Sequence, residues 1–167
     1  MLCGRPMARP LLPLLSVLVL AAVARATEPA HVEYPAGFRQ WAVVKSMVIY
    51  SDKHPLFAQF GGFHSVYVNA KGLPAMTKGG SFPDGSVLVF DLLEARDENG
   101  AYVEGDRKLT AVMVKDRQRY KPTGGWGFDA FKGDSRTERA VSDVAGQCFG
   151  CHQQQKANDF VFSAFHP

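Results

Sequence analysis

The sequence predicts a mainly β (α+β) fold, built as one antiparallel β-sheet with a few short helices and a helix near the C-terminus. Two observations carry this prediction. Short segments rich in Val, Phe, Tyr and Leu recur along the chain, and clusters of Gly, Pro and Asp lie between most of them. The segments that we expect to form strands are 41–50, 64–70, 87–93, 109–115 and 160–165.

The expected turns contain residues that adopt a positive φ or fix φ at the proline value. They are Gly61-Gly62, Pro83-Asp84-Gly85, Asp97–Gly100 and Pro122–Gly125. Because such short connections favour hairpins, we expect neighbouring strands to pair antiparallel.

Helical signals are few. We expect helix at 36–44, at 73–78 and at 142–156, where Ser142 or Asp143 can cap the first turn. The sequence contains neither an internal repeat nor a linker, so residues 27–167 are predicted to form a single domain.

The N-terminus has the features of a secretory signal peptide. Arg5 and Arg9 precede the apolar run Leu11–Ala24, and Ala24-Arg25-Ala26 is a small-x-small cleavage site. A transmembrane anchor is less favoured because the run is shorter than the ~20 apolar residues that a bilayer requires. We expect residues 1–26 to be removed and the protein to be exported to the periplasm.

Charge excludes one class of partner. The full chain has a net charge of +3, and residues 1–26 contain three arginines and no acidic residue, so the mature chain is neutral. A nucleic-acid partner would require a retained basic face. We therefore predict neither a nucleic-acid partner nor, after signal cleavage, a membrane-bound protein.

The strongest motif is Cys148-Phe149-Gly150-Cys151-His152, which matches the Cys-x-x-Cys-His pattern of c-type haem attachment. On a helix the two cysteines lie on one face and can reach the two vinyl groups, while the histidine faces the iron. A redox disulfide and half of a zinc site are the alternatives, but zinc would require a second pair of ligands that the sequence lacks. We predict one covalently bound haem c, with Cys148 and Cys151 as attachment sites and His152 as the proximal iron ligand.

The position of the motif argues against a simple electron carrier, because it follows a β-rich body instead of opening a helical chain. No candidate sixth ligand stands in a marked motif, so we expect an open distal site. The histidines and methionines considered for that role are His31, His54, His64, Met47, Met76 and Met113.

The chain resembles the cytochrome P460 and cytochrome c′-beta family. The resemblance implies a mainly β fold, a homodimer and a five-coordinate haem whose proximal ligand is the motif histidine. The sequence segments that match the family are Tyr34-Pro35-x-Gly37-Phe38-Arg39-x-Trp41, Lys45–Ile49, His54-Pro55-Leu56, Phe60-Gly61-Gly62, Val66–Asn69, Phe82–Val87, Gly124–Phe128, Cys148–His152 and Asp159-x-Val161-Phe162.

Two activities occur in that family. P460 proteins oxidise hydroxylamine with a haem cross-linked to a lysine, and Lys78 aligns with that position, although it can equally be a solvated loop lysine. Hydroxylamine oxidation also requires a distal acid/base, for which Asp129 is the first candidate and Asp91 the second.

The c′-beta members instead bind nitric oxide or carbon monoxide in an apolar pocket, for which Phe60, Phe82 and Phe90 are the candidates. The segments Pro83–Phe90 and Lys45–Ile49 are more similar to this group, so gas binding is the favoured function. An electron-transfer cytochrome that acts with a redox partner protein is the least favoured. His166 stands where c′-beta members have a proximal arginine, and is either a residue near the proximal face or a frayed C-terminal one.

Overall fold

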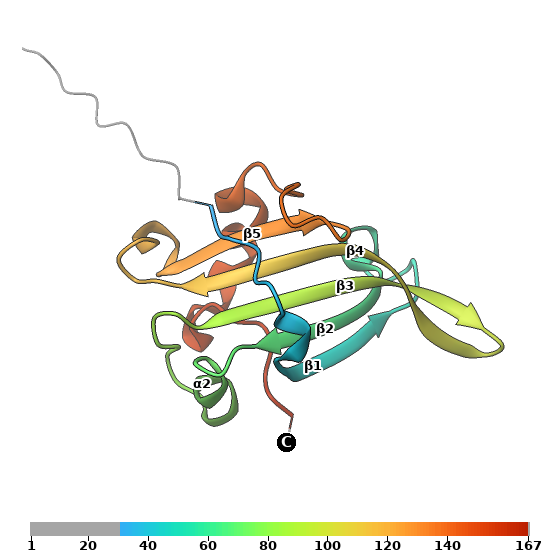
Figure 1. The fold of residues 1–167 in the computed structure, drawn as a ribbon, viewed down its shortest axis with the longest axis horizontal. Helices are drawn as coiled ribbons and strands as arrows, with labels where there is room; N and C mark the ends of the chain where they lie inside the picture. Colours follow the sequence, from blue (N-terminus) through green and yellow to red (C-terminus); the bar gives the residue numbers. More distant parts are fainter. Residues whose placement is uncertain (1–30, 167) are drawn as a thin grey trace, which may run out of the picture.

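The computed structural model describes residues 31–166, so the predicted signal peptide lies outside the described residues. They form a five-stranded antiparallel sheet in which the strands are ordered as in the chain, β1-β2-β3-β4-β5 (Figure 1). This confirms the predicted fold class. The strands are β1 (Ala42–Ile49), β2 (Gly62–Val68), β3 (Val87–Glu98), β4 (Ala101–Lys115) and β5 (Trp126–Lys132).

The helical elements are short. None of those in residues 31–166 has the length and hydropathy needed to cross a bilayer. They are η1 (Phe38–Gln40), α1 (Phe57–Phe60), α2 (Leu73–Lys78), η2 (Lys121–Thr123), η3 (Ala145–Phe149), α3 (Gly150–His152) and η4 (Gln153–Asn158).

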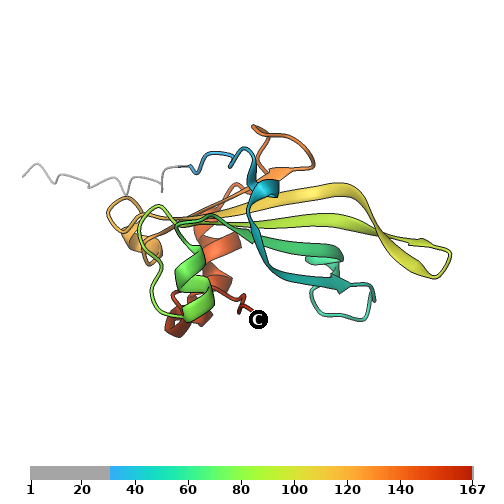
Figure 2. The ribbon, with the colours of Figure 1, turned by 60° about the horizontal axis from the view of Figure 1, so that its bottom comes forward.

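The hairpin of β3 and β4 confirms the turn predicted at Asp97–Gly100. Asn99 and Gly100 have φ of 55° and 83°, the left-handed pair that a two-residue type I′ hairpin requires. The two strands are the longest of the sheet, and their turn projects well beyond the other strands (Figures 1 and 2).

Three predicted elements were wrong or incomplete. Residues 160–165 form no strand, β5 was missed, and the helix expected at 36–44 is only the turn η1, because β1 begins at Ala42. The glycines around Trp126 suggested a turn. In the structure Gly127 lies within β5, where an added Cβ would come 2.3 Å from Cζ of Tyr120, so glycine makes room for that ring.

Strand β1 forms one edge of the sheet. Its register with β2 shifts between Val43 and Lys45, which leaves Val44 as an extra residue in the strand. Such a bulge locally disrupts the ladder and bends the strand.

The two faces of the sheet are covered differently. The helical face carries Val66, Leu88, Phe90, Met113 and Phe128, and α2 and the C-terminal helical segment pack against it (Figure 2). We call the opposite side the N-terminal face, because the segment before β1 covers it (Figure 1). Its apolar residues include Tyr67, Val89, Val112 and Phe131, which pack with Val32, Tyr34 and Phe38.

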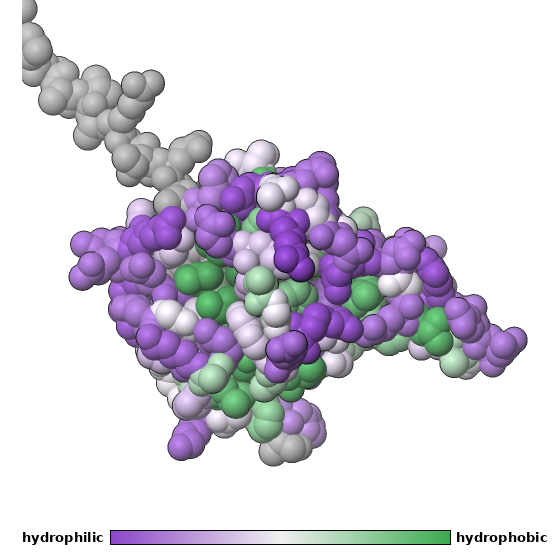
Figure 3. All heavy atoms as spheres, in the orientation of Figure 1, coloured by the Kyte–Doolittle hydropathy of each residue, from purple (hydrophilic) through white to green (hydrophobic). Residues whose placement is uncertain are grey.

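The N-terminal face also holds a buried ion cluster. The carboxylate of Asp91 is fully buried, and it accepts hydrogen bonds from Arg39 Nη1 at 2.7 Å and from Arg107 Nε at 2.6 Å. Figure 3 views the molecule from this side and shows hydrophilic residues on much of its rim and along the projecting hairpin.

Replacing Asp91 with alanine should lower the free energy of unfolding by about 3 kcal/mol, because the largely buried Arg107 would lose its buried partner and keep only the exposed Asp134. Asp106→Ala is the matched control, since Asp106 pairs with Arg96 at 3.0 Å in solvent and should change the stability by less than ~1 kcal/mol. Urea unfolding of both variants measures the difference. Equal effects would show that the Asp91 pair behaves as a surface ion pair.

Candidate haem site

A capped helix presents the Cys-x-x-Cys-His motif, as predicted. The carboxylate of Asp143 accepts the backbone N–H of Gly146 at 3.0 Å, which identifies Asp143 as the cap. The side-chain oxygen of Gln147 accepts the N–H of Asp143 at 2.9 Å. The segment opens with a π-helical turn over Ala145–Phe149 before α3 begins.

The two cysteines lie in different surroundings, since Cys148 is half-buried and Cys151 is exposed. Burial raises the pKa of Cys148 to about 11, and the negative charge of Asp129 and the neighbouring Cys151 add to the increase. Redox-active cysteines usually have a lowered pKa. The raised pKa of Cys148 therefore argues against a redox-active disulfide at this motif.

The ring of His152 is held in one tautomer. Its Nδ1 lies 2.8 Å from the carbonyl oxygen of Phe160, and because a carbonyl only accepts, Nδ1 carries the proton. Burial lowers the pKa of His152, which outweighs the opposing effect of this hydrogen bond. The neutral imidazole therefore presents the lone pair of Nε2, which is the state in which histidine binds iron.

Aromatic side chains surround this imidazole. The ring centroids of Phe128 and Phe162 lie 4.9 Å and 5.1 Å from that of His152. Phe162 is 53% exposed, and Phe60 and Met47 are also exposed large apolar side chains. A flat apolar group beside His152 would cover the exposed Phe162 ring, and these apolar surroundings of the imidazole fit a haem.

Of the three phenylalanines predicted for the distal side, the structure brings two together. Phe60 and Phe90 make an edge-to-face contact with ring centroids 5.6 Å apart, and Phe90 lies on the helical face. His64 joins them, with its ring 4.8 Å from that of Phe90. Phe82 lies in the core against Trp126 at 5.4 Å, apart from this cluster.

The structure does not bring Asp129 to the helical face. Side chains alternate along β5, so Phe128 faces the haem motif and Asp129 faces away from it. The buried carboxylate of Asp129 pairs with Arg139 and accepts the N–H of Val32 at 3.3 Å. Asp91, the second candidate for the distal acid/base, lies on the same N-terminal face.

Lys78 and His166 are placed near the helical side of the molecule. Lys78 is the exposed last residue of α2, and Gly79 follows with a φ of 80°. His166 lines a hollow of about 350 Å³ together with Val43, Val44, Lys45 and Ser46 of β1. Their predicted roles, as a cross-link and as a residue near the proximal face, stay predictions.

The other candidates for a sixth ligand are scattered. His31 lies on the N-terminal face, with Nδ1 3.3 Å from Asp129. His54 is exposed, and its Nδ1 accepts the N–H of Leu56 at 3.2 Å. Met76 and Met113 belong to the hydrophobic core of the helical face, whereas Met47 is exposed on β1.

Within residues 31–166, no group of three or more His, Cys, Asp and Glu side chains is placed to hold a metal ion. The second pair of ligands that a zinc site would require is thus not found near Cys148 and Cys151. A capped helix that presents two cysteines and a neutral, oriented histidine against an apolar sheet fits the class of c-type haem proteins.

The sequence model of the cytochrome P460 family matches residues 35–163, which is most of the chain. The chain therefore belongs to the cytochrome P460 family, which implies a covalently bound c-type haem. No curated protein matches this chain. Sequence reasoning named the attachment residues but missed the contacts of Phe128, Phe160 and Phe162 with His152. Phe128 and Phe162 both lie in segments of the sequence that resemble the family, and that resemblance was the signal that could have identified these contacts.

We expect His64 to remain neutral below the pH at which an unfolded histidine protonates. Burial lowers its pKa, more than the hydrogen bond with the Phe60 carbonyl raises it. The folded state then binds fewer protons than the unfolded state, so stability falls as the pH drops below about 6.5. The slope of unfolding free energy against pH between about 5 and 7 should be shallower in His64→Gln. An unchanged slope would contradict this assignment.

Proposed function

We propose that this chain is a periplasmic c-type haem protein that binds small diatomic gases, nitric oxide among them, at an open distal site. One observation carries the proposal. In residues 31–166 the two fully buried carboxylates, Asp91 and Asp129, both lie on the N-terminal face in ion pairs with arginines. The Phe60–Phe90 cluster on the helical face holds no carboxylate, and its one ionisable side chain, His64, has Nε2 in a hydrogen bond with the Phe60 carbonyl.

This distribution favours binding over oxidation. Oxidation of hydroxylamine releases protons, which a base within hydrogen-bond reach of the substrate must accept. Anions and water bind poorly at an apolar surface, because they give up interactions with bulk water that the surface does not replace. A neutral diatomic gas gives up few such interactions. A bound haem would supply the iron at which the gas coordinates.

Each group of the site has a role in this proposal. Cys148 and Cys151 hold the haem by thioether bonds, and the Nε2 of His152 is the proximal ligand. Phe60 and Phe90 limit the size and polarity of what approaches on the opposite side. We further propose that the mature protein is a homodimer, as its family resemblance implies.

A reduced-state absorption spectrum of the holoprotein, followed by titration with nitric oxide and carbon monoxide, tests the proposed function. An ordinary high-spin c-type spectrum that changes on gas addition is expected. A broad, strongly red-shifted Soret band would instead identify a P460-type hydroxylamine oxidoreductase. A sharp low-spin spectrum without gas binding would identify an electron-transfer cytochrome.

Phe60→Ala should increase the rate of carbon monoxide binding, because removal of the exposed ring widens access to the helical face. We expect a change on the order of tenfold, equivalent to about 1.4 kcal/mol. Leu56→Ala is the matched control, since Leu56 is an exposed apolar residue of the same connection and its carbonyl keeps the hydrogen bond from the Phe60 N–H after the substitution. Equal rates in the two variants would remove Phe60 from the distal side.

Lys78→Leu should leave the spectrum of the holoprotein unchanged and alter stability by less than ~0.5 kcal/mol, as for other exposed surface positions. Lys71→Leu, a substitution of another exposed lysine beside α2, serves as the control. If only Lys78→Leu shifts the Soret band, the lysine is bonded to the porphyrin and the gas-binding proposal fails.

A further inference from the structure

The carbonyl group that orients His152 lies in an unusual turn. Asp159 and Phe160, neither of them glycine, have φ of 46° and 66°. The left-handed region is unfavourable for such residues, and two in succession persist only where the surroundings hold them. The Phe160 oxygen in this turn accepts the Nδ1–H of His152.

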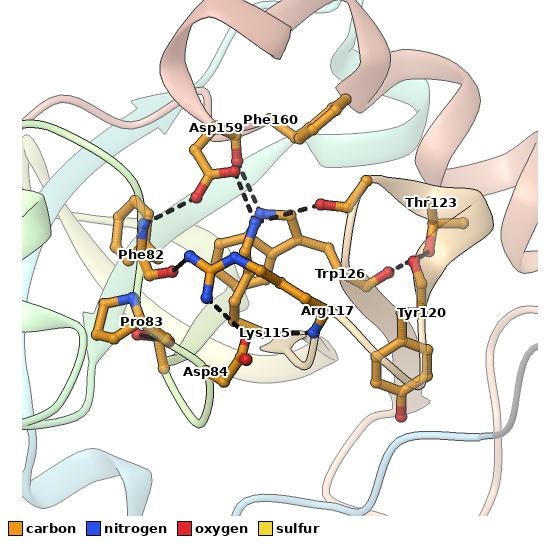
Figure 4. A network of polar contacts seen from close by, with 12 residues as sticks. Phe82, Pro83, Asp84, Lys115, Arg117, Tyr120, Thr123, Trp126, Asp159 and Phe160 are labelled. Atoms are coloured by element: carbon orange, nitrogen blue, oxygen red, sulfur yellow. Dashed lines mark hydrogen bonds and ion pairs between the residues drawn. The ribbon is translucent and has the colours of Figure 1, made fainter.

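Asp159 is held through all three of its oxygens (Figure 4). One carboxylate oxygen lies 2.6 Å from Nζ of Lys115, and the other accepts the backbone N–H of Phe82 at 2.8 Å. Its carbonyl oxygen accepts the indole N–H of Trp126 at 2.8 Å. The turn is thereby tied to β4, to the connection before β3, and to β5.

Lys115 is an uncommon residue in such a place, since only 2% of it is exposed. Its ammonium also donates to the carbonyl of Gly124 at 3.2 Å and lies 4.9 Å from the centre of the Trp126 ring. Burial of a charge is unfavourable unless it is paired and hydrogen-bonded. The buried position of Lys115 is explained if its ion pair with Asp159 has a function in addition to packing.

We propose that the buried Lys115–Asp159 ion pair is a positioning device for the proximal histidine. The pair holds the left-handed turn, the turn places the Phe160 carbonyl, and the carbonyl sets the direction and strength of the hydrogen bond from His152. Lys115 and Asp159 touch neither the imidazole nor the haem in this scheme. The inference rests on the part of the proposed function that makes His152 the proximal ligand.

The expected chemical consequence follows from the hydrogen bond. A hydrogen bond from Nδ1–H makes the imidazole a stronger donor at Nε2. A stronger donor strengthens the iron–histidine bond and stabilises the oxidised iron relative to the reduced iron. Loss of the ion pair should therefore weaken the bond and raise the reduction potential.

Lys115→Met and Asp159→Asn in the full-length holoprotein test the proposal. Asparagine keeps an oxygen that can accept the Phe82 N–H and removes only the charge, so it is the milder variant should Lys115→Met fail to fold. Lys132→Met is the matched control, because Lys132 on β5 makes an exposed ion pair with Glu138 at 2.8 Å.

The measurements are the iron–histidine stretching frequency of the ferrous protein by resonance Raman spectroscopy, and the midpoint potential. We expect a lower frequency and a higher potential in the Lys115 and Asp159 variants, and wild-type values in Lys132→Met. If the folded variants lose stability but keep both values, the pair is merely structural and the proposal is overturned.

Gas titration of the wild-type protein separates this inference from the proposed function. A wild-type protein that binds no gas would end the gas-binding proposal, while the potentials of the variants would still report on the proximal side. His152→Ala should abolish the iron–histidine band. A band that persists in that variant would overturn the inference, because another residue would then be the ligand.

Discussion

The arrangement of this protein depends on the two-residue alternation of side chains in β3 and β5. The alternation sends Phe90 and Phe128 to the helical face, and Asp91 and Asp129 to the N-terminal face. A slip of one residue in either strand would exchange the two sets and move a carboxylate to the apolar helical face. The arginines at Asp91 and Asp129 stabilise the observed register, because each carboxylate finds its partner only on the N-terminal face.

Local chemistry explains which elements could be predicted from the sequence. The type I′ turn at Asn99-Gly100 and the helix Leu73–Lys78 carry their signals within a few residues, and both predictions were confirmed. Strand β5 was missed because Gly127 is required by the ring of Tyr120, a contact that no local pattern reveals. Residues 160–165 have the composition of a strand, but the left-handed Asp159 and Phe160 direct the chain away from the sheet.

The residues of the candidate site also differ in how far the sequence alone predicts them. The attachment motif is local, so Cys148, Cys151 and His152 could be named from spacing alone. The partner of Lys115 is 44 residues away in the chain, and an isolated Lys115 or Asp159 looks like an ordinary surface residue in the sequence. Asp129 is a distal candidate in the sequence because it is a carboxylate directly after the family segment Gly124–Phe128. The face to which it points depends on the exact register of β5, which the sequence alone does not provide.

The extra residue in β1 has a consequence for the sheet as a whole. A straight edge strand offers its free N–H and C=O groups to any extended chain, including a second copy of itself. Val44, the third residue of β1, interrupts that row, and the exposed Lys45 places a charge beside the interruption. The C-terminal segment also ends close to this strand (Figures 1 and 2). The bulge therefore protects the protein against open-ended sheet growth at the edge nearest its chain end.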